Sequence, residues 1–287
     1  IFILYNILFM KITKKLLSEI NNDPVKYATY TDIDILSEVL DKFNEAYHST
    51  DKPLVTDIVY DILYDKLKER DPDNEFFKKI GAKVKIKKEE VKIPFPMGSL
   101  SKIKPDTGFL EPWLKKYKGP YVVSDKLDGI SAQVYNDPKL GLKMYTRGEM
   151  TDEGNIGQDI TDLMKYIDCG EVKNIPSGHS VRGELIITKS DFEKANSKYK
   201  NIRNAVGGIV GTKKNLDIQF AKLIKFMTYA IIHPEYTQEE QMKLLKKYKL
   251  HLVEYKVKKS LDESFLKEYL IDRRKNSEFM IDGLVIV

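Results

Sequence analysis

The spacing of apolar residues changes once along this chain, and this change constrains the fold more than any other feature. In residues 31–68 apolar residues recur every three or four positions, as Ile35, Val39, Phe43 and Ala46 do. That periodicity is typical of helices with one buried face. Beyond residue 94 the apolar residues form short runs separated by turn residues, which is typical of strands. The order predicts an α+β fold, with a small helical domain followed by a mixed one.

Two helices are predicted in the first part from their caps and breaks. The first begins at Thr31 or Asp32. The second runs from about Thr56 to Arg70, where an Asp-Pro-Asp sequence ends it. We therefore expect a domain boundary between this short helical module and the strand-rich part of the chain.

A run of charged residues at 83–92 supplies that boundary, and we interpret it as a solvated strand or linker. The predicted domains are therefore a helical one at residues 10–88 and a mixed one at 89–287, which we expect to be incomplete at its C-terminus. In the second domain we predict strands at residues 121–123, 131–135, 141–146, 180–188, 226–232 and 280–287, and helices at 191–199, 238–248 and 261–274.

Composition excludes some classes of protein. The single cysteine, Cys169, rules out an intramolecular disulfide and a multi-cysteine zinc site, so we expect a reducing, intracellular location. The net charge of +5 suits a nucleic-acid partner without requiring one. The first ten residues are apolar but span only about half a bilayer and follow no positive charge. We expect no membrane insertion and no secretion, and we expect Met10 to be the start of the protein.

Lys126-Leu127-Asp128-Gly129 stands between two predicted strands. A lysine amine at the mouth of a sheet can act as a nucleophile once it loses its proton. By itself the string is weak, because a lysine before Asp-Gly is more often part of an ordinary turn. The motifs that follow it strengthen the functional interpretation, since they place arginines and carboxylates at strand ends and in loops. They lie in Thr146-Arg147-Gly148, Val181-Arg182-Gly183-Glu184, Asn201-Ile202-Arg203-Asn204-Ala205 and Ile281-Asp282-Gly283. Cations for phosphate and carboxylates for a metal ion are what a nucleotide site requires.

This ordered series resembles the nucleotidyltransferase domain of NAD⁺-dependent DNA ligases, from about residue 90 to the end of the chain. The resemblance implies an ATP-grasp-like adenylation domain of mixed α/β structure. Lys-x-Asp-Gly also occurs in ATP-dependent ligases and mRNA capping enzymes, so this motif does not choose the cofactor.

The N-terminal helices carry a second resemblance that does bear on the cofactor. In these ligases a small helical domain recognises nicotinamide mononucleotide through a Tyr-His pair and a following Asp-x-x-Tyr-Asp. The chain has Tyr47 and His48, then Asp57, Tyr60 and Asp61. The last three stand at i, i+3 and i+4, so one helix face presents them. Aromatic rings can stack on the cationic nicotinamide, although tyrosines in the core and aspartate caps would give a similar pattern.

The resemblance also implies a role for each matching residue. Lys126 is similar to the nucleophile that attacks the α-phosphate of NAD⁺, and Asp128 to the motif aspartate beside it. Glu184 and Asp282 match carboxylates that contact Mg²⁺, Glu184 also matching a ribose contact. The other matching positions are Arg147 for ribose and phosphate, Arg203 and Arg274 for phosphate, Tyr229 for stacking on adenine, and Ser99 with Leu100 for the nucleotide pocket.

Three positions depart from the pattern. Ser124 stands where the family has a glutamate that reads adenine, and its neighbour Asp125 should face the other way on a strand. Gly211 stands in place of a second arginine, and Val287 in place of a lysine.

From the resemblance we expect an adenylation module that forms lysyl-AMP on Lys126 with NAD and Mg²⁺, acts on nicked double-stranded DNA within a longer enzyme, and is a monomer. Two alternatives remain open. One is an ATP-dependent lysine nucleotidyltransferase, and the other is a degenerate, non-catalytic module that binds nucleotide or DNA.

Overall fold

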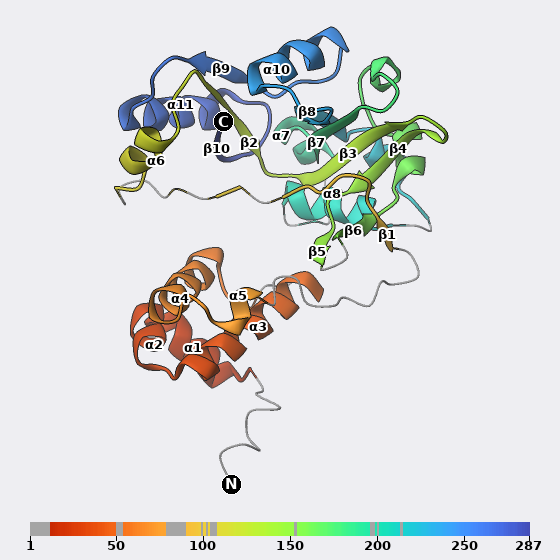
Figure 1. Ribbon diagram of the computed structural model, residues 1–287. Helices are drawn as coiled ribbons and strands as arrows, with labels where there is room; N and C mark the ends of the chain where they lie inside the picture. Colours follow the sequence, from red (N-terminus) through yellow and green to blue (C-terminus); the bar gives the residue numbers. More distant parts are fainter. Residues whose placement is uncertain are drawn as a thin grey trace. The chain divides into compact units, whose positions relative to one another are not determined.

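The computed structural model describes residues 12–49, 54–78, 90–98, 100–101, 103, 108–151, 154–195, 199, 201–212 and 215–287. The chain divides into two compact units, Ile1–Lys83 and Val84–Val287, and each is described by itself (Figure 1). The expectation that Met10 is the start of the protein lies outside the described residues, as do residues 50–53 of the predicted helix break and most of the charged run at 83–92.

The described part of the first unit is built from helices. They are α1 (Lys14–Asn22), α2 (Pro24–Tyr30), α3 (Ile33–Ser49), α4 (Asp57–Arg70) and α5 (Glu75–Lys78). The predictions for α3 and α4 are confirmed. Asp32 accepts a hydrogen bond from the Asp34 amide at the start of α3, and Thr56 caps α4 through the Val59 amide.

The core of the first unit uses part of the α3 face that its periodicity predicted, because Val39 and Phe43 are buried as expected. Leu36, Val39, Leu40 and Phe43 are buried, whereas Ile35 is 42% exposed. The unpredicted helices α1 and α2 contribute Ile20, Tyr27 and Ala28 to this core. Side-chain hydrogen bonds also connect α4 to α2. The Arg70 guanidinium donates to the carbonyl oxygens of Ala28, near the end of α2, and of Thr31 in the following turn.

In the second unit the described residues form three small antiparallel sheets. Its strands are β1 (Glu90–Lys92), β2 (Tyr121–Leu127), β3 (Ile130–Asp137), β4 (Gly141–Thr146), β5 (Glu149–Thr151), β6 (Gly154–Gln158), β7 (Ser180–Ile186), β8 (Lys225–His233), β9 (Tyr255–Lys258) and β10 (Ile281–Ile286). The strand orders are β1-β6-β5, β10-β2-β9 and β4-β3-β7-β8. The α+β class predicted from the sequence is therefore confirmed.

Helices flank these sheets. They are α6 (Leu110–Lys116), α7 (Lys189–Lys194), α8 (Ile202–Val210), α9 (Ile218–Ala221), α10 (Gln238–Lys247) and α11 (Glu263–Asn276), with 3₁₀ turns η3 (Thr161–Lys165) and η4 (Val172–Asn174). Figure 1 shows α8 beside β3 and β7, and α11 beside β2 and β10. Among the described residues no helix combines the length and the apolar character that crossing a bilayer requires.

The turn after β2 joins two sheets rather than two paired strands. β2 lies in the sheet β10-β2-β9, whereas β3 lies in β4-β3-β7-β8. β2 also extends to Leu127, so Lys126 is a strand residue and only Asp128 and Gly129 form the turn. The two-residue turn therefore brings the ends of two sheets together at the motif lysine.

Candidate functional site

Lys126 lies opposite Asp282, where β2 pairs with β10. Ile281 pairs with Leu127 and Gly283 pairs with Lys126, so Asp282 is the extra residue of a β-bulge. A bulge redirects the side chain it carries, and here the Asp282 carboxylate contacts Lys126 Nζ. Both side chains are about half exposed, at 49% and 52%. The lysine amine therefore sits beside an acidic group and remains accessible to a ligand.

Arg274 binds the backbone of this bulge. Its Nη2 donates to the carbonyl oxygen of Asp282 over 2.8 Å, and its Nε lies 3.4 Å from the carbonyl oxygen of Ile281. A bulge leaves ladder groups unpaired, and the guanidinium satisfies them. The family resemblance implied a phosphate contact for Arg274. In the structure its Nε and Nη2 donate to backbone carbonyl oxygens of the bulge.

Glu184 and Tyr229 belong to the facing sheet, on β7 and β8. Glu184 is 8% exposed, and burial raises the pKa of its carboxyl group to about 7. Tyr229 Oη lies 3.0 Å from Ser131 Oγ and 3.5 Å from a Glu184 oxygen. Burial also raises the pKa of Tyr229, and the Glu184 charge adds to that rise. The carboxyl group can thus hold a proton or bind a hydroxyl group near neutral pH.

Four cations gather around Glu184. Arg203, Arg182 and Lys126 each lower the pKa of its carboxyl group against the effect of burial. The pKa of Arg147 is lowered by burial and by the neighbouring charge of Arg182, and Glu184 acts on it in the opposite direction. Positive groups from both sheets therefore surround one buried carboxyl group, which is the electrostatic setting for a bound phosphate.

Arg203, at the start of α8, holds the turn after the lysine strand. Its Nη1 donates to the carbonyl oxygen of Gly129 over 2.7 Å and lies 3.4 Å from Asp128 Oδ1. Gly129 is required there, because a Cβ would lie 2.3 Å from the carbonyl oxygen of Leu185. The side chain of Asp128 is therefore directed at an arginine, and β7 approaches the turn closely.

Gly148 makes a second close approach in the motif that carries Arg147. Its φ is +58°, and a Cβ on it would lie 1.7 Å from the carbonyl oxygen of Ile156. The backbone amide of Arg147 donates to the carbonyl oxygen of Ser131 over 3.0 Å. The glycine thus lets β6 pass behind Arg147 while the arginine stays attached to β3.

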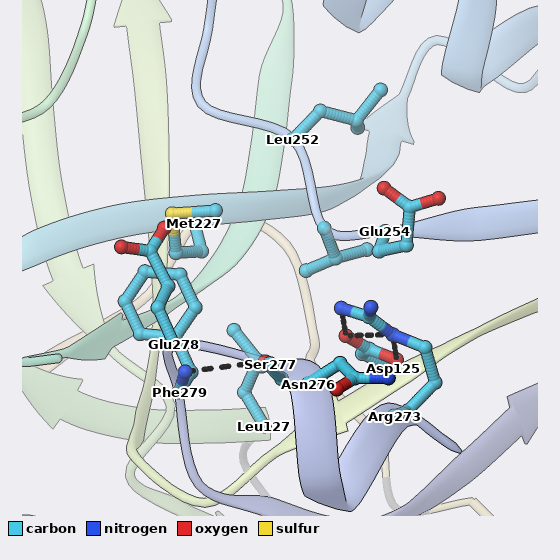
Figure 2. A pocket seen from close by; sticks show the side chains of 11 residues that line it. Asp125, Leu127, Met227, Leu252, Glu254, Arg273, Asn276, Ser277, Glu278 and Phe279 are labelled. Atoms are coloured by element: carbon cyan, nitrogen blue, oxygen red, sulfur yellow. Dashed lines mark hydrogen bonds and ion pairs between the residues drawn. The ribbon is translucent and has the colours of Figure 1, made fainter. Parts of the chain in front are cut away.

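Asp125 faces away from Lys126, as the sequence predicted. It forms an ion pair with Arg273 of α11 and lines a cavity of about 290 Å³ that Lys126 does not line (Figure 2). Ser124, on the same face of β2 as Lys126, is 4% exposed. The acidic neighbour therefore has no access to the face that carries the lysine amine.

The segment before α6 also reaches the site. The carbonyl oxygen of Gly98 accepts a hydrogen bond from Arg182 Nη1 over 3.1 Å. Leu100 is 62% exposed, and Ser99 lies outside the described residues. The predicted pocket residues Ser99 and Leu100 thus directly follow a residue that contacts the site.

The predicted nicotinamide residues all belong to the first unit. Tyr47 and His48 lie on α3, and Asp57 begins α4, but the side chains of these three lie outside the described residues. Tyr60 Oη donates to Asn44 Oδ1 of α3 over 2.8 Å, and burial raises its pKa to about 12. Asp61 is partly buried one residue further along α4. The structure therefore joins the two motif helices through Tyr60.

Metal binding rests on few ligands. Among the described residues there is no group of three or more His, Cys, Asp or Glu side chains that could hold an ion. Glu184 on β7 and Asp282 on β10 are the two carboxylates for which the family resemblance implied a Mg²⁺ contact. Mg²⁺ at nucleotide sites commonly takes one or two carboxylates and completes its shell with phosphate and water, so these residues suit a metal that arrives with a nucleotide.

Three residues had no individual role predicted from the sequence: Ser131 and Arg182 at this site, and Arg273 against Asp125 on the opposite face of β2. Arg182 donates to Ser131 Oγ over 3.3 Å and lies 5.7 Å from the centre of the Tyr229 ring. Its place two residues before Glu184 was a usable signal, because alternate residues of a strand share a face. Arg273 left no such signal, since its partner is 148 positions away.

Comparison with known proteins gives consistent matches. The family model for the NAD-dependent DNA ligase adenylation domain matches residues 107–287. A DNA ligase of Acanthamoeba polyphaga mimivirus is 42% identical over 254 residues, covering 88% of this chain and 39% of that protein. A DNA ligase of Rickettsia bellii is 34% identical over 88% of this chain and 40% of its own length. A solved structure from a study of Lig E DNA ligases has a TM-score of 0.38 and 20% identity over 58% of this chain and 54% of that one. The chain thus spans about two fifths of the length of these two curated relatives.

Proposed function

Because the chain belongs to the NAD-dependent DNA ligase adenylation domain family, we propose that Lys126 accepts AMP from NAD⁺ as the first step of DNA nick sealing. The contact between Lys126 Nζ and the Asp282 carboxylate carries this proposal. It puts an accessible amine beside a proton acceptor, and this amine acts with Arg182 and Arg203 on the buried carboxyl group of Glu184.

The reaction begins when the Lys126 ammonium loses its proton, for which the contacting carboxylate of Asp282 is the nearest acceptor in the described site. The Nζ lone pair attacks the α-phosphorus, so that an N–P bond forms. The bond from that phosphorus to the bridging oxygen breaks, and nicotinamide mononucleotide leaves with the electron pair. The products are lysyl-AMP and nicotinamide mononucleotide.

The other residues bind and orient the nucleotide. Arg147, Arg182 and Arg203 supply charge for the phosphates, and Glu184 suits a ribose hydroxyl group because burial raises its pKa to about 7. Tyr229 offers a ring on the same sheet for adenine. Mg²⁺, held by Glu184, Asp282 and phosphate oxygens, would neutralise charge that develops on the phosphate.

NAD⁺ rather than ATP is proposed as the donor because of the first unit. Its helices carry Tyr47, His48, Asp57, Tyr60 and Asp61 in the order that resembles a nicotinamide mononucleotide site. The family model that matches the second unit is that of the NAD-dependent enzymes. An ATP-dependent nucleotidyltransferase is the alternative that the first experiment must separate.

The joining of the nicked DNA strand, in the two steps that follow lysyl-AMP formation, is part of the same proposal. AMP would pass from Lys126 to the 5′-phosphate of a nick, and the 3′-hydroxyl group would then displace AMP. The relatives named DNA ligase are more than twice as long as the part matched here. We therefore assign the first step to this chain and propose nicked DNA as the substrate of the longer protein.

The test is covalent labelling. The purified chain is incubated with Mg²⁺ and either adenylate-labelled NAD⁺ or labelled ATP, with Lys126→Ala as the control. Label from NAD⁺ alone, absent in the variant, supports the proposal. Label from ATP alone identifies the alternative donor. Label from neither, also in a protein extended past Val287, identifies a non-catalytic module.

A further inference from the structure

Two adjacent arginines at the C-terminal end of α11 bind the two strands that carry Lys126 and Asp282. Arg274 binds the carbonyl oxygens of the β10 bulge. Arg273 binds β2 through the carboxylate of Asp125 (Figure 2). One helix end therefore contacts both sides of the Lys126–Asp282 pair.

The Asp125–Arg273 ion pair has the geometry of a rigid fork. Arg273 Nε lies 3.0 and 3.2 Å from the two Asp125 oxygens, and Nη2 lies 2.9 Å from one of them. Such two-point bonds fix orientation as well as distance. The Asp125 side chain is 2% exposed and that of Arg273 18%, so water and salt compete with the pair only weakly.

The paired side chains also border an open space. Both line the cavity of about 290 Å³, together with Leu127, Met227 and Phe279 (Figure 2). On that side the guanidinium borders the cavity. The hydrogen bonds to Asp125 set the orientation of the guanidinium toward β2 and attach this end of β2 to α11.

Asp125 immediately precedes Lys126 on the strand. Neighbouring residues point to opposite faces, so a pull on the Asp125 side chain acts on the backbone that presents the lysine. We propose that Arg273 is a positioning residue that, through Asp125, fixes Lys126 in register with Asp282 for attack on the phosphate. This inference rests on the proposed function, because that function makes Lys126 the nucleophile.

The kinetic test uses the full chain with Arg273→Lys, Arg273→Gln and the neutral double variant Asp125→Asn/Arg273→Gln. The double variant avoids leaving one buried charge without its partner. Single-turnover formation of lysyl-AMP is followed over a range of labelled NAD⁺ concentrations. We expect the maximal rate to fall roughly 10- to 100-fold, as displaced reacting groups do, while the half-saturating concentration changes by less than about threefold. Arg273→Lys should fall between the wild type and Arg273→Gln.

The control is Ile175→Val, a buried site beside the end of β3 that is remote from the turn. It should lower stability through a residue that belongs to neither β2 nor α11. If the Arg273 variants lose rate only in proportion to their unfolded fraction, as this control does, the positioning role is wrong. A raised half-saturating concentration with an unchanged maximal rate would also overturn it.

A second readout needs no nucleotide. An amine-acylating reagent is applied briefly, and modification of Lys126 and Lys143 is compared by mass spectrometry. Lys143 pairs with Asp159 at 3.7 Å on another sheet and serves as the internal reference. We expect Lys126 to react faster relative to Lys143 in Arg273→Gln, because its contact with Asp282 is loosened. If the wild type forms no lysyl-AMP, the proposed function fails, and an unchanged reactivity ratio would separately reject the positioning role.

Discussion

Arg203 Nη1 lies 2.7 Å from the carbonyl oxygen of Gly129, and this hydrogen bond attaches the start of α8 to the turn between the two sheets. The same nitrogen lies 3.4 Å from Asp128 Oδ1. One arginine therefore supports the turn after Lys126 and adds positive charge beside Glu184.

Replacing Arg203 should weaken both its support of the turn after Lys126 and the positive charge that it adds beside Glu184. Arg203→Lys keeps the charge but loses the planar fork, so lysyl-AMP formation should slow on the order of 10-fold. Arg203→Ala should slow it on the order of 100-fold. Labelling rates measure both, with the exposed Lys247→Ala as a control. Equal rates for Arg203→Ala and wild type would contradict a role for this side chain.

Glu184 should make stability depend on pH. Its pKa in the folded protein is about 7, above the ordinary 4.5, so the folded state binds the proton more tightly. The free energy of unfolding should therefore fall by about 3 kcal/mol as pH rises from roughly 4.5 to 7. Glu184→Gln should lack this component. Urea unfolding at several pH values tests it, and parallel curves for variant and wild type would refute it.

Gly148 and Gly141 allow a matched comparison. Both have positive φ, +58° and +74°, but only at Gly148 would a Cβ meet another atom, the Ile156 carbonyl oxygen at 1.7 Å. Gly141→Ala should cost about 1–2 kcal/mol of stability from backbone strain. Gly148→Ala should cost at least about 2 kcal/mol more, because β6 must move. Similar urea midpoints for the two variants would show that the close approach is unimportant.

Tyr269 offers a stabilising change. The residue is 4% exposed, and its hydroxyl oxygen has no hydrogen-bond partner among the described residues. Tyr269→Phe removes a buried polar group and keeps the ring against which Lys256 lies. The free energy of unfolding should stay constant or rise by about 1 kcal/mol. A loss of stability in chemical denaturation would mean that the hydroxyl group is satisfied in solution.

A substitution of Tyr60 tests whether NAD⁺ is the AMP donor. Excess nicotinamide mononucleotide should remove AMP from labelled Lys126 by reversing the first step. Tyr60→Ala should raise the concentration required roughly 10-fold, through loss of a ring contact with the cationic base. Tyr30→Ala, at an 81% exposed tyrosine of the same unit, is the control. Identical discharge curves for Tyr60→Ala and wild type would remove this residue from the proposed nicotinamide site.

Periodicity located most long elements of the chain, and local chemistry explains the successes. Thr56 caps α4 as predicted, and β4 runs over the predicted residues 141–146. The helices α1, α2 and α8 were not predicted. Asp23 and Pro24 supply the N-cap and first position of α2, a start signal that the sequence reading did not use. On α3 the prediction is right for Val39 and Phe43 and wrong for Ile35, which is 42% exposed while Leu36 beside it is buried.

The site was predictable where motifs supply the residues and unpredictable where distant segments meet. Family membership followed from the motifs around Lys126, and the match to residues 107–287 confirms it. The individual roles of the site residues stay predictions. Nothing local indicates that Asp125 pairs with Arg273, or that a bulge aims Asp282 at the lysine. Both depend on strand register and helix placement, which only the folded chain defines.

The turn at Asp128 and Gly129 has a consequence for how this protein can change over evolution. Because it carries the chain from one sheet to the other, the reacting groups meet along a seam rather than within one element. Substitutions inside either sheet leave the length of this connection unchanged. Adding or removing one residue at the turn would shift every group on one side against its partners, so the length of this connection should be far less variable than its surroundings.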